Sequence, residues 1–174
     1  MMTFILGGGC FWCLDSSYMQ FKGVSDVVVG YMGGSVPDPG YEAVCSGKTG
    51  HAEVAKVIFD EQVIPAEIIL DIFFTLHDPT QMNRQGNDIG TQYRSVMYYT
   101  DEQQREMFAA AIEKAKEVWG ENVVTELSPA SEFWVGEEYH QDFFAKNPNQ
   151  GYCNAVVAPK MLKTRKAFTD YLVD

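Results

Sequence analysis

The order of helical and β-rich segments limits the fold of this chain more than any other feature. Apolar residues at helical spacing mark two helices among the first 99 residues, one from Trp12 to Phe21 and one that begins at Pro65. The order strand, helix, strand, strand, helix, strand is that of the split βαβ unit of ferredoxin-like sheets. We therefore expect an α+β fold in two layers, with helices on one face of a mixed or antiparallel sheet. The four strands are predicted at Thr3–Leu6, Val27–Tyr31, Glu53–Phe59 and Ser95–Tyr99.

The second half of the chain continues this pattern. Thr100 and Gln103 have the spacing of a capping box for a helix that runs to Trp119 and is ended by Gly120. No repeat or linker divides the 174 residues, so we predict a single catalytic domain over residues 1–174. One more strand is predicted at Val123–Leu127, and helices are predicted at Glu137–Lys146 and Pro159–Leu172.

Three long segments carry glycine but little regular pattern. They are Met32–Gly50, His77–Arg94 and Asn147–Ala158. Loops of this length in a compact domain are commonly functional. Their aromatic and polar content favours a functional role, so we expect the site to be built from these loops.

The charge balance excludes some classes of partner. Thirteen basic and twenty-four acidic residues give a formal net charge of −11. An acidic body repels phosphate backbones and anionic lipid headgroups, so we expect neither nucleic acid nor membrane partners. The chain begins with no basic region and only a short apolar run, so we expect a cytoplasmic protein. In that reducing compartment, four cysteines indicate redox, nucleophilic or metal chemistry before a disulfide framework.

The densest chemical signal is a run of three glycines followed by Cys10, Phe11, Trp12 and Cys13. The glycines follow the first predicted strand and allow the backbone to approach a ligand closely. Cys10 lies at the predicted N-terminus of the first helix, where unpaired N–H groups and the helix dipole stabilise an anion. We therefore expect a nucleophilic thiolate at Cys10 with a lowered pKa.

Other roles for these cysteines stay open on this evidence. Cys10 can be a small buried apolar residue at a tight turn. Cys10 and Cys13 can form half of a zinc site, completed by Cys45 and His51, although a second close pair of ligands is missing. The pair can also exchange disulfides in the manner of thioredoxin, which assigns no role to the acid and loop residues described next.

A candidate acid partner begins the third predicted strand. Strand alternation places Glu53 on the same face as Val57 and Phe59, at the end of an apolar row. Burial raises the pKa of a carboxyl group, and a protonated glutamate near a thiolate can act as a general acid. The pattern equally allows Glu53 to lie in solvent at the strand start. Two further candidates, Asp88 and Tyr93, lie in the polar loop from Arg84 to Ser95, which the pattern equally allows to be a surface turn.

Short motifs spread over most of the chain match one known family in order. In sequence they are Gly9-Cys10-Phe11-Trp12, Gly30-Tyr31 with Gly33-Gly34, Pro39-Gly40-Tyr41, Val44-Cys45-Ser46-Gly47, Thr49 to Glu53, His77-Asp78-Pro79, Arg84 to Asp88, Gly90 to Ser95, Tyr139-His140-Gln141, and Asn147-Pro148 with Gly151-Tyr152-Cys153. With these motifs the chain resembles the methionine sulfoxide reductase A family, the peptide-methionine (S)-S-oxide reductases. No single tripeptide is specific, but so many motifs in register make the resemblance specific.

The resemblance implies a role for each matching residue. Cys10 would be the thiolate that attacks the sulfoxide sulfur. Phe11 and Trp12 would form the apolar pocket that holds the S-methyl group of the substrate. The other implied site residues are Glu53, which would protonate the sulfoxide oxygen, Tyr41 and Tyr93, which would hydrogen-bond to that oxygen, and Asp88, on the polar side of the pocket.

The resemblance also implies a redox cycle. Attack would release methionine and leave a sulfenic acid on Cys10, which condenses readily with a second thiol. Many family members have glycine where Cys13 stands, and others have cysteine. This chain has both Cys13 and Cys153, so two thiols compete to resolve Cys10. We expect Cys153 to act first, with Cys13 as the alternative or second resolving thiol.

The implied reductant is thioredoxin, or dithiothreitol in vitro, with no bound cofactor and no metal. Oxidised proteins and free methionine sulfoxide would be the substrates, and repair of oxidised proteins would be the role. The alternative function is a non-catalytic redox or zinc-binding sensor that uses Cys10, Cys13 and Cys45.

Overall fold

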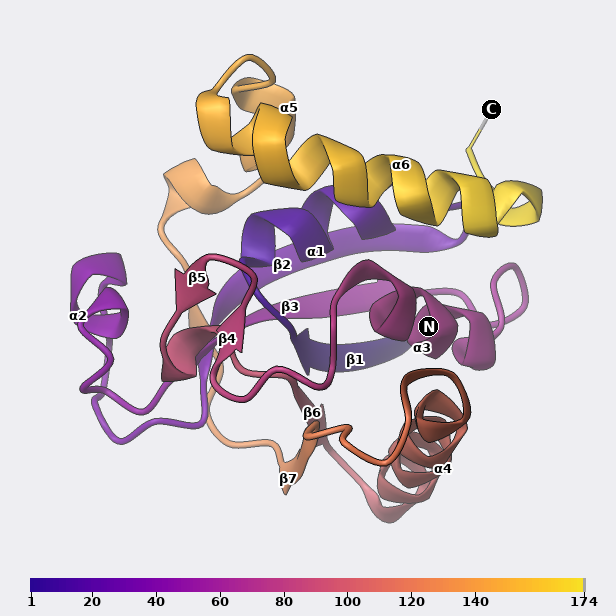
Figure 1. Cartoon of the computed structure of the whole chain (residues 1–174), viewed down its shortest axis with the longest axis horizontal. Helices are drawn as coiled ribbons and strands as arrows, with labels where there is room; N and C mark the ends of the chain where they lie inside the picture. The colour runs from indigo at the N-terminus through magenta and orange to yellow at the C-terminus, as the bar shows by residue number, and fades with distance from the viewer. Residues whose placement is uncertain (174) are drawn as a thin grey trace.

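A computed structural model describes residues 1–173 of the chain and contains one large sheet (Figure 1). Its six strands lie in the order β7-β6-β1-β3-β2-β8. β3 lies antiparallel between β1 and β2, and β6 lies antiparallel to β1 on its other side. This is the split βαβ arrangement, so the predicted α+β, ferredoxin-like fold is confirmed. The strands are β1 (Met2–Gly7), β2 (Val24–Met32), β3 (Ala52–Phe59), β6 (Val96–Tyr99), β7 (Glu126–Pro129) and β8 (Trp134–Val135).

Helices pack on one face of this sheet, as predicted. A buried apolar core joins them to the strands, and within it the ring of Phe4 lies 5.0 Å from that of Phe59 and 4.9 Å from that of Phe108. The last long helix, drawn in yellow in Figure 1, contacts both α1 and α3. The helices are α1 (Phe11–Tyr18), α3 (Ala66–Leu76), α4 (Glu102–Trp119) and α6 (Ala158–Ala167).

The other face of the sheet carries a smaller cluster. Because side chains alternate along a strand, Ile5 points away from Phe4 and packs with Val54 and Tyr98. Phe133, from the segment between β7 and β8, packs against this cluster. The large apolar core therefore lies on the helical side, and α1 enters it directly from the end of β1.

The predicted loops contain several short elements. Within Asn147–Ala158, which we expected to lack regular structure, the chain is helical from Gly151 and leads into α6. Cys153 therefore lies on a helix and not on an irregular loop. The short elements are α2 (Tyr41–Cys45), β4 (Arg84–Gln85), β5 (Asp88–Ile89), α5 (Phe143–Lys146), the 3₁₀ turns Thr91–Tyr93, Glu138–His140 and Thr169–Tyr171, and a π-helical turn at Cys153–Val157.

Helix α4 begins one residue later than the predicted capping box. The side chain of Asp101, not that of Thr100, accepts the hydrogen bond from the backbone N–H of Gln104 at 2.8 Å. The Gln104 side chain accepts from the N–H of Thr100 at 3.1 Å. Two adjacent residues that can both cap made the register ambiguous in the sequence.

Residue 174, the last of the predicted domain, lies outside the described residues. Within residues 1–173, no helix combines the length and apolar character needed to span a membrane.

Candidate active site

Cys10 lies in the turn that connects β1 to α1. Gly9 has a φ of +81°, which favours glycine, and a Cβ atom there would lie 3.0 Å from the side chain of Gln85. Gly8 packs against His77, whose ring would lie 2.9 Å from a Cβ atom at position 8. The tight turn makes Cys10 the N-cap of α1, where the sequence predicted it, and buries its side chain.

The thiols of Cys10 and Cys13 form a buried, hydrogen-bonded pair. Burial raises the pKa of Cys10 well above its usual value, and the bond with Cys13 and the charge of Glu53 act in the same direction. The N–H of Trp12 lowers this pKa, as the helix terminus predicts, but burial outweighs it. The lowered pKa predicted for Cys10 is therefore wrong for the protein without substrate. The hydrogen bond with Cys10 instead lowers the pKa of Cys13.

Glu53 is the second residue of β3 and is only 1% exposed. Its Oε1 accepts a hydrogen bond from the backbone N–H of Phe11 at 3.1 Å, whereas Oε2 has no partner among residues 1–173. Burial raises the pKa of Glu53 to about 8, although the bond from Phe11 opposes this shift. The carboxyl group is therefore mostly protonated at neutral pH and can donate a hydrogen bond.

Aromatic rings hold Trp12 beside the thiols. Its indole stacks on Phe143 at 3.7 Å with an interplanar angle of 4°, and Tyr152 meets it edge-on at 5.8 Å. The indole Nε1 donates to Nδ1 of His140 at 3.0 Å. Because Nδ1 accepts and burial lowers the pKa of His140, the neutral ring carries its proton on Nε2, 4.0 Å from Glu137. Trp12 is thus fixed on three sides.

The two tyrosines of the predicted site approach Glu53 from separate segments. Tyr41 begins α2, and Tyr93 ends the 3₁₀ turn that follows β5. The Tyr93 carbonyl accepts from the N–H of Gly9 at 3.2 Å, which ties this turn to the nucleophile turn. Burial raises the pKa of both phenols, and the charge of Glu53 adds to the shift. Both hydroxyls therefore remain protonated and able to donate.

Asp88 and Cys153 connect the site to the C-terminal segment. Asp88, on β5, accepts a hydrogen bond from the hydroxyl of Tyr152. Cys153 is fully buried at the start of the π-helical turn, and burial and the charge of Cys13 raise its pKa. The structure thus brings all the site residues predicted from the sequence to the region around the N-terminus of α1.

Comparison with known proteins agrees with this geometry. A family model described as peptide methionine sulfoxide reductase matches residues 2–172. The chain belongs to the peptide methionine sulfoxide reductase family. A relative named peptide methionine sulfoxide reductase MsrA, from Clavibacter michiganensis subsp. michiganensis, is 59% identical over 172 residues, which cover 99% of this chain and 98% of the relative. The chain is therefore an oxidoreductase that acts on methionine sulfoxide.

Solved structures resemble this reductase over most of its length. The reduced form of Mxr1 from Saccharomyces cerevisiae has a TM-score of 0.82 and 35% identity, covering 87% of this chain and 88% of that one. Methionine sulfoxide reductase A of Corynebacterium diphtheriae has a TM-score of 0.79 and 33% identity, with coverage of 88% and 77%. Mxr1 in complex with Trx2 shares the fold, with a TM-score of 0.58, 23% identity and coverage of 82% and 84%.

Sequence reasoning assigned no role to several residues that shape this reductase site. Glu137 accepts hydrogen bonds from the Tyr31 hydroxyl and from the N–H of Tyr41, each at 3.0 Å. His140 and Tyr152 contact Trp12, as described above. Both lie in motifs quoted for the resemblance, which was the signal available for them. The hydrogen bonds of Glu137 to Tyr41 and of His140 to Trp12 cross more than 90 positions of sequence, so no local pattern could indicate them.

The zinc alternative finds no ligand set in the reductase. Within residues 1–173, no three or more His, Cys, Asp or Glu side chains are arranged to hold a metal ion. The ring nitrogens of His51 lie 3.0 Å from the N–H of Gly34 and 2.7 Å from the carbonyl of Val36. Cys45 lies exposed at the end of α2. His51 therefore holds the loop of Gly34 and Val36, and the Cys45 thiol lies near Tyr41 and Tyr93.

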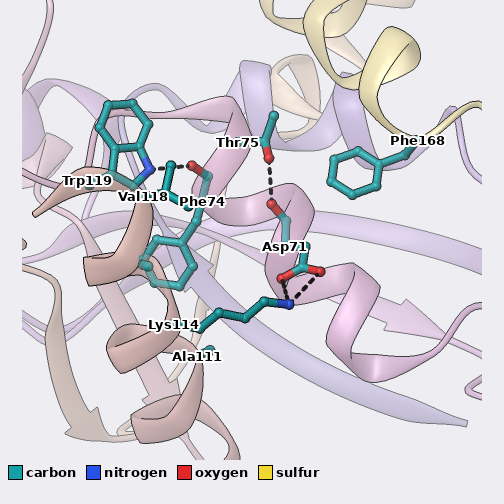
Figure 2. A pocket seen from close by; sticks show the side chains of 9 residues that line it. Asp71, Phe74, Thr75, Ala111, Lys114, Val118, Trp119 and Phe168 are labelled. Atoms are coloured by element: carbon teal, nitrogen blue, oxygen red, sulfur yellow. Dashed lines mark hydrogen bonds and ion pairs between the residues drawn. The ribbon is translucent and has the colours of Figure 1, made fainter.

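A cavity of about 270 Å³ lies between α3 and α4, apart from the thiols (Figure 2). Lys114 pairs with Asp71 at 3.0 Å across it, and the indole N–H of Trp119 donates to the carbonyl of Phe74 at 3.1 Å. None of its lining residues is a cysteine or histidine. Because its polar groups satisfy one another, the geometry assigns no chemistry to this cavity.

The raised pKa of Glu53 predicts a pH-dependent cost in stability. The folded protein holds the proton more tightly than the unfolded chain, whose glutamate has a pKa near 4.5, so this group lowers stability as pH rises from about 4.5 to 8. Glu53→Gln keeps an acceptor for the Phe11 N–H but cannot ionise. We expect the variant to be more stable than the wild type by up to about 3 kcal/mol at pH 7 and to lose this advantage near pH 4.5.

Thermal unfolding of both proteins between pH 4.5 and 8 measures this difference. Glu117→Gln, the same change at an exposed position of α4, is the control and should show no such trend. If the difference in stability between Glu53→Gln and the wild type does not increase with pH, Glu53 is not held protonated in the folded protein.

Proposed function

We propose that this reductase converts methionine (S)-sulfoxide, free or within proteins, to methionine in a single catalytic domain spanning residues 1–174. The observation that carries the proposal is a buried, protonated Glu53 with one unused oxygen beside the buried thiol of Cys10. A sulfoxide is reduced only if its oxygen is protonated or hydrogen-bonded as it leaves sulfur. Glu53 offers that proton where water is excluded.

In the first step, Cys10 attacks the sulfoxide sulfur. The S–O bond of the substrate breaks, methionine leaves, and the oxygen remains on Cys10 as a sulfenic acid, so that substrate sulfur is reduced and Cys10 is oxidised. Glu53 gives its proton to the oxygen, and the proton lost by the Cys10 thiol replaces it on the Glu53 carboxyl group. A neutral Glu53 also favours ionisation of Cys10, since the charge of Glu53 raises the pKa of that thiol.

The surrounding residues bind and orient the substrate. Phe11 and Trp12 supply the apolar surface for the S-methyl group, and the stacking of Trp12 on Phe143 keeps that surface in place. Tyr41 and Tyr93 donate hydrogen bonds to the sulfoxide oxygen, which their raised pKa values permit. Asp88, held by Tyr152, forms the polar side of the pocket.

The resolving step uses the other two buried thiols. The hydrogen bond between Cys10 and Cys13 favours Cys13 as the first partner, whereas Cys153 interacts electrostatically with Cys13. We therefore propose a Cys10–Cys13 disulfide that passes to Cys13–Cys153, which reverses the order expected from sequence. The Cys13–Cys153 disulfide, which joins α1 to the start of the π-helical turn, is then the bond that the reductant opens.

The proposed reductant is thioredoxin, replaceable by dithiothreitol in vitro, with no bound cofactor. Mxr1, which resembles this chain, has been solved in complex with Trx2, and this supports a thioredoxin partner. Repair of oxidised methionine in cytoplasmic proteins would be the role. The acidic surface, with a net charge of −11, agrees with partners other than nucleic acid or anionic membrane.

The substrate assignment is tested with the two sulfoxide epimers supplied separately. With dithiothreitol, we expect methionine from the S epimer of both free methionine sulfoxide and a methionine sulfoxide peptide, and none from the R epimer. Cys10→Ser should form no methionine, because a serine hydroxyl is neither ionised nor soft enough to attack sulfur. Methionine formation by that variant, or equal use of the two epimers, would refute the mechanism.

The acid role of Glu53 predicts a particular pH profile for the first methionine formed. The rate should fall as pH rises through about 8, because Glu53 must carry its proton. Glu53→Gln should slow this step by about 10²–10⁴-fold and remove that dependence. Rapid-quench measurement of a single turnover gives both results. An unchanged rate would transfer the donor role to Tyr41 or Tyr93.

The order of the thiols predicts different oxidised species in single variants. After one turnover without reductant, Cys153→Ser should contain a Cys10–Cys13 disulfide, and Cys13→Ser should keep a sulfenic acid that dimedone traps on Cys10. Peptide mapping distinguishes the two. With thioredoxin, Cys13→Ser should lose more multiple turnover than Cys153→Ser. The reverse pattern would restore Cys153 as the first partner.

A further inference from the structure

A lysine on the C-terminal helix faces the turn that carries Cys10. Lys160 is the third residue of α6, and its side chain is half-buried. Its Nζ atom lies 3.6 Å from the position that a Cβ atom on Gly9 would occupy. The ammonium group therefore stands directly over the glycine turn, on the side where α6 contacts α1.

The ammonium group of Lys160 has no acidic partner there. Among residues 1–173 it forms no ion pair and no hydrogen bond, although the chain carries a net charge of −11. Lysine side chains are normally solvated or paired, so a half-buried and unpaired one at a reactive turn calls for a functional account.

The groups around Cys13 show which thiol this cation affects. Among the described residues whose charges or hydrogen bonds shift the pKa of Cys13, Lys160 is the one basic side chain, and its charge favours the thiolate of Cys13. His77 also faces Lys160, but burial lowers its pKa to about 4, so its ring is neutral. The titratable groups that act on Cys13 or respond to it are Cys10, Glu53, Asp88, Tyr152, Cys153 and Lys160.

We propose that Lys160 is a positioning residue for the resolving step, which holds Cys13 as the thiolate that attacks the sulfenic acid of Cys10. The Cys13 sulfur bonds to the Cys10 sulfur, the S–O bond breaks, and hydroxide leaves and takes a proton to become water. Cys13 is oxidised and Cys10 is reduced to the disulfide level. This inference rests on the proposed function and assigns a residue to its second step.

Opposite demands of the two steps explain why a cation is needed at Cys13. The first step requires a proton on Glu53, which burial provides. The second requires a sulfur without a proton in the same buried region, where burial and the charge of Asp88 disfavour the anion. The Cys10 thiol supports the Cys13 thiolate before turnover, but it no longer exists once Cys10 is a sulfenic acid. Lys160 and the hydroxyl of Tyr152 then remain as the groups that favour the thiolate, and of these two Lys160 is the one with a positive charge.

The test compares Lys160→Gln with the wild type and with Lys160→Arg, which keeps the charge. We expect Lys160→Gln to raise the pH at which the Cys13 thiolate appears by about half to one unit, and to slow disulfide formation at neutral pH about three- to tenfold. Thiolate ultraviolet absorbance, with Cys13→Ser as the reference, measures the first effect. Dimedone trapping of the Cys10 sulfenic acid measures the second. Lys160→Arg should restore both values.

Lys163→Gln is the matched control, because Lys163 lies on the same helix with its ammonium 5.9 Å from the Trp119 ring. It should change neither measurement. In Lys160→Gln, the first methionine should form at the wild-type rate, which shows that the proposed function is intact. An unchanged thiolate titration and disulfide rate would overturn the proposal. So would an equal loss in the first step, or a raised KM confined to free methionine sulfoxide, since Lys160 would then act on Cys10 or on the substrate carboxylate.

Discussion

A buried carboxyl group that keeps its proton is the constraint on which the rest of this site depends. Glu53 lies at the start of β3, between β1 and β2, where the sheet excludes water. One backbone hydrogen bond, from Phe11, orients the carboxyl group without stabilising its anion strongly. Several such bonds would lower its pKa and remove the proton that reduction of a sulfoxide requires. The close turn at Gly8 and Gly9 is what brings Phe11 to this oxygen.

The second half of the chain supports the first turn of α1. His140 orients the indole of Trp12, Phe143 stacks on it, and Tyr152 connects its edge to Asp88. These residues lie on a 3₁₀ turn and on short helical segments that have little stability of their own, so their contacts with α1 order them. The substrate pocket and the C-terminal thiol are therefore formed together, because Tyr152 and Cys153 are adjacent in the chain.

The sequence predicted the parts of this structure that local pattern determines. The strands and the long helices follow apolar periodicity, and Cys10 was placed correctly at the helix N-terminus. The predicted cap of α4 was off by one residue because Thr100 and Asp101 can both cap a helix. The predicted direction of the Cys10 pKa shift was wrong because burial, which depends on the whole fold, outweighs the effect of the local helix dipole. Tyr41, Asp88 and Tyr93 were indicated only by family resemblance, since their neighbours around Glu53 are distant in sequence.

The same burial acts differently on the acid and on the thiols, and this difference orders the chemistry. Desolvation favours the neutral forms of Glu53, Tyr41 and Tyr93, which suits these three groups as donors. It opposes any thiolate, so a sulfur anion forms only where a specific partner compensates. Cys13 has such partners in the Cys10 thiol, Lys160 and the Tyr152 hydroxyl, whereas the pKa of Cys153 is raised. A disulfide passed from Cys10 to Cys153 therefore moves through Cys13, the thiol whose surroundings best support attack.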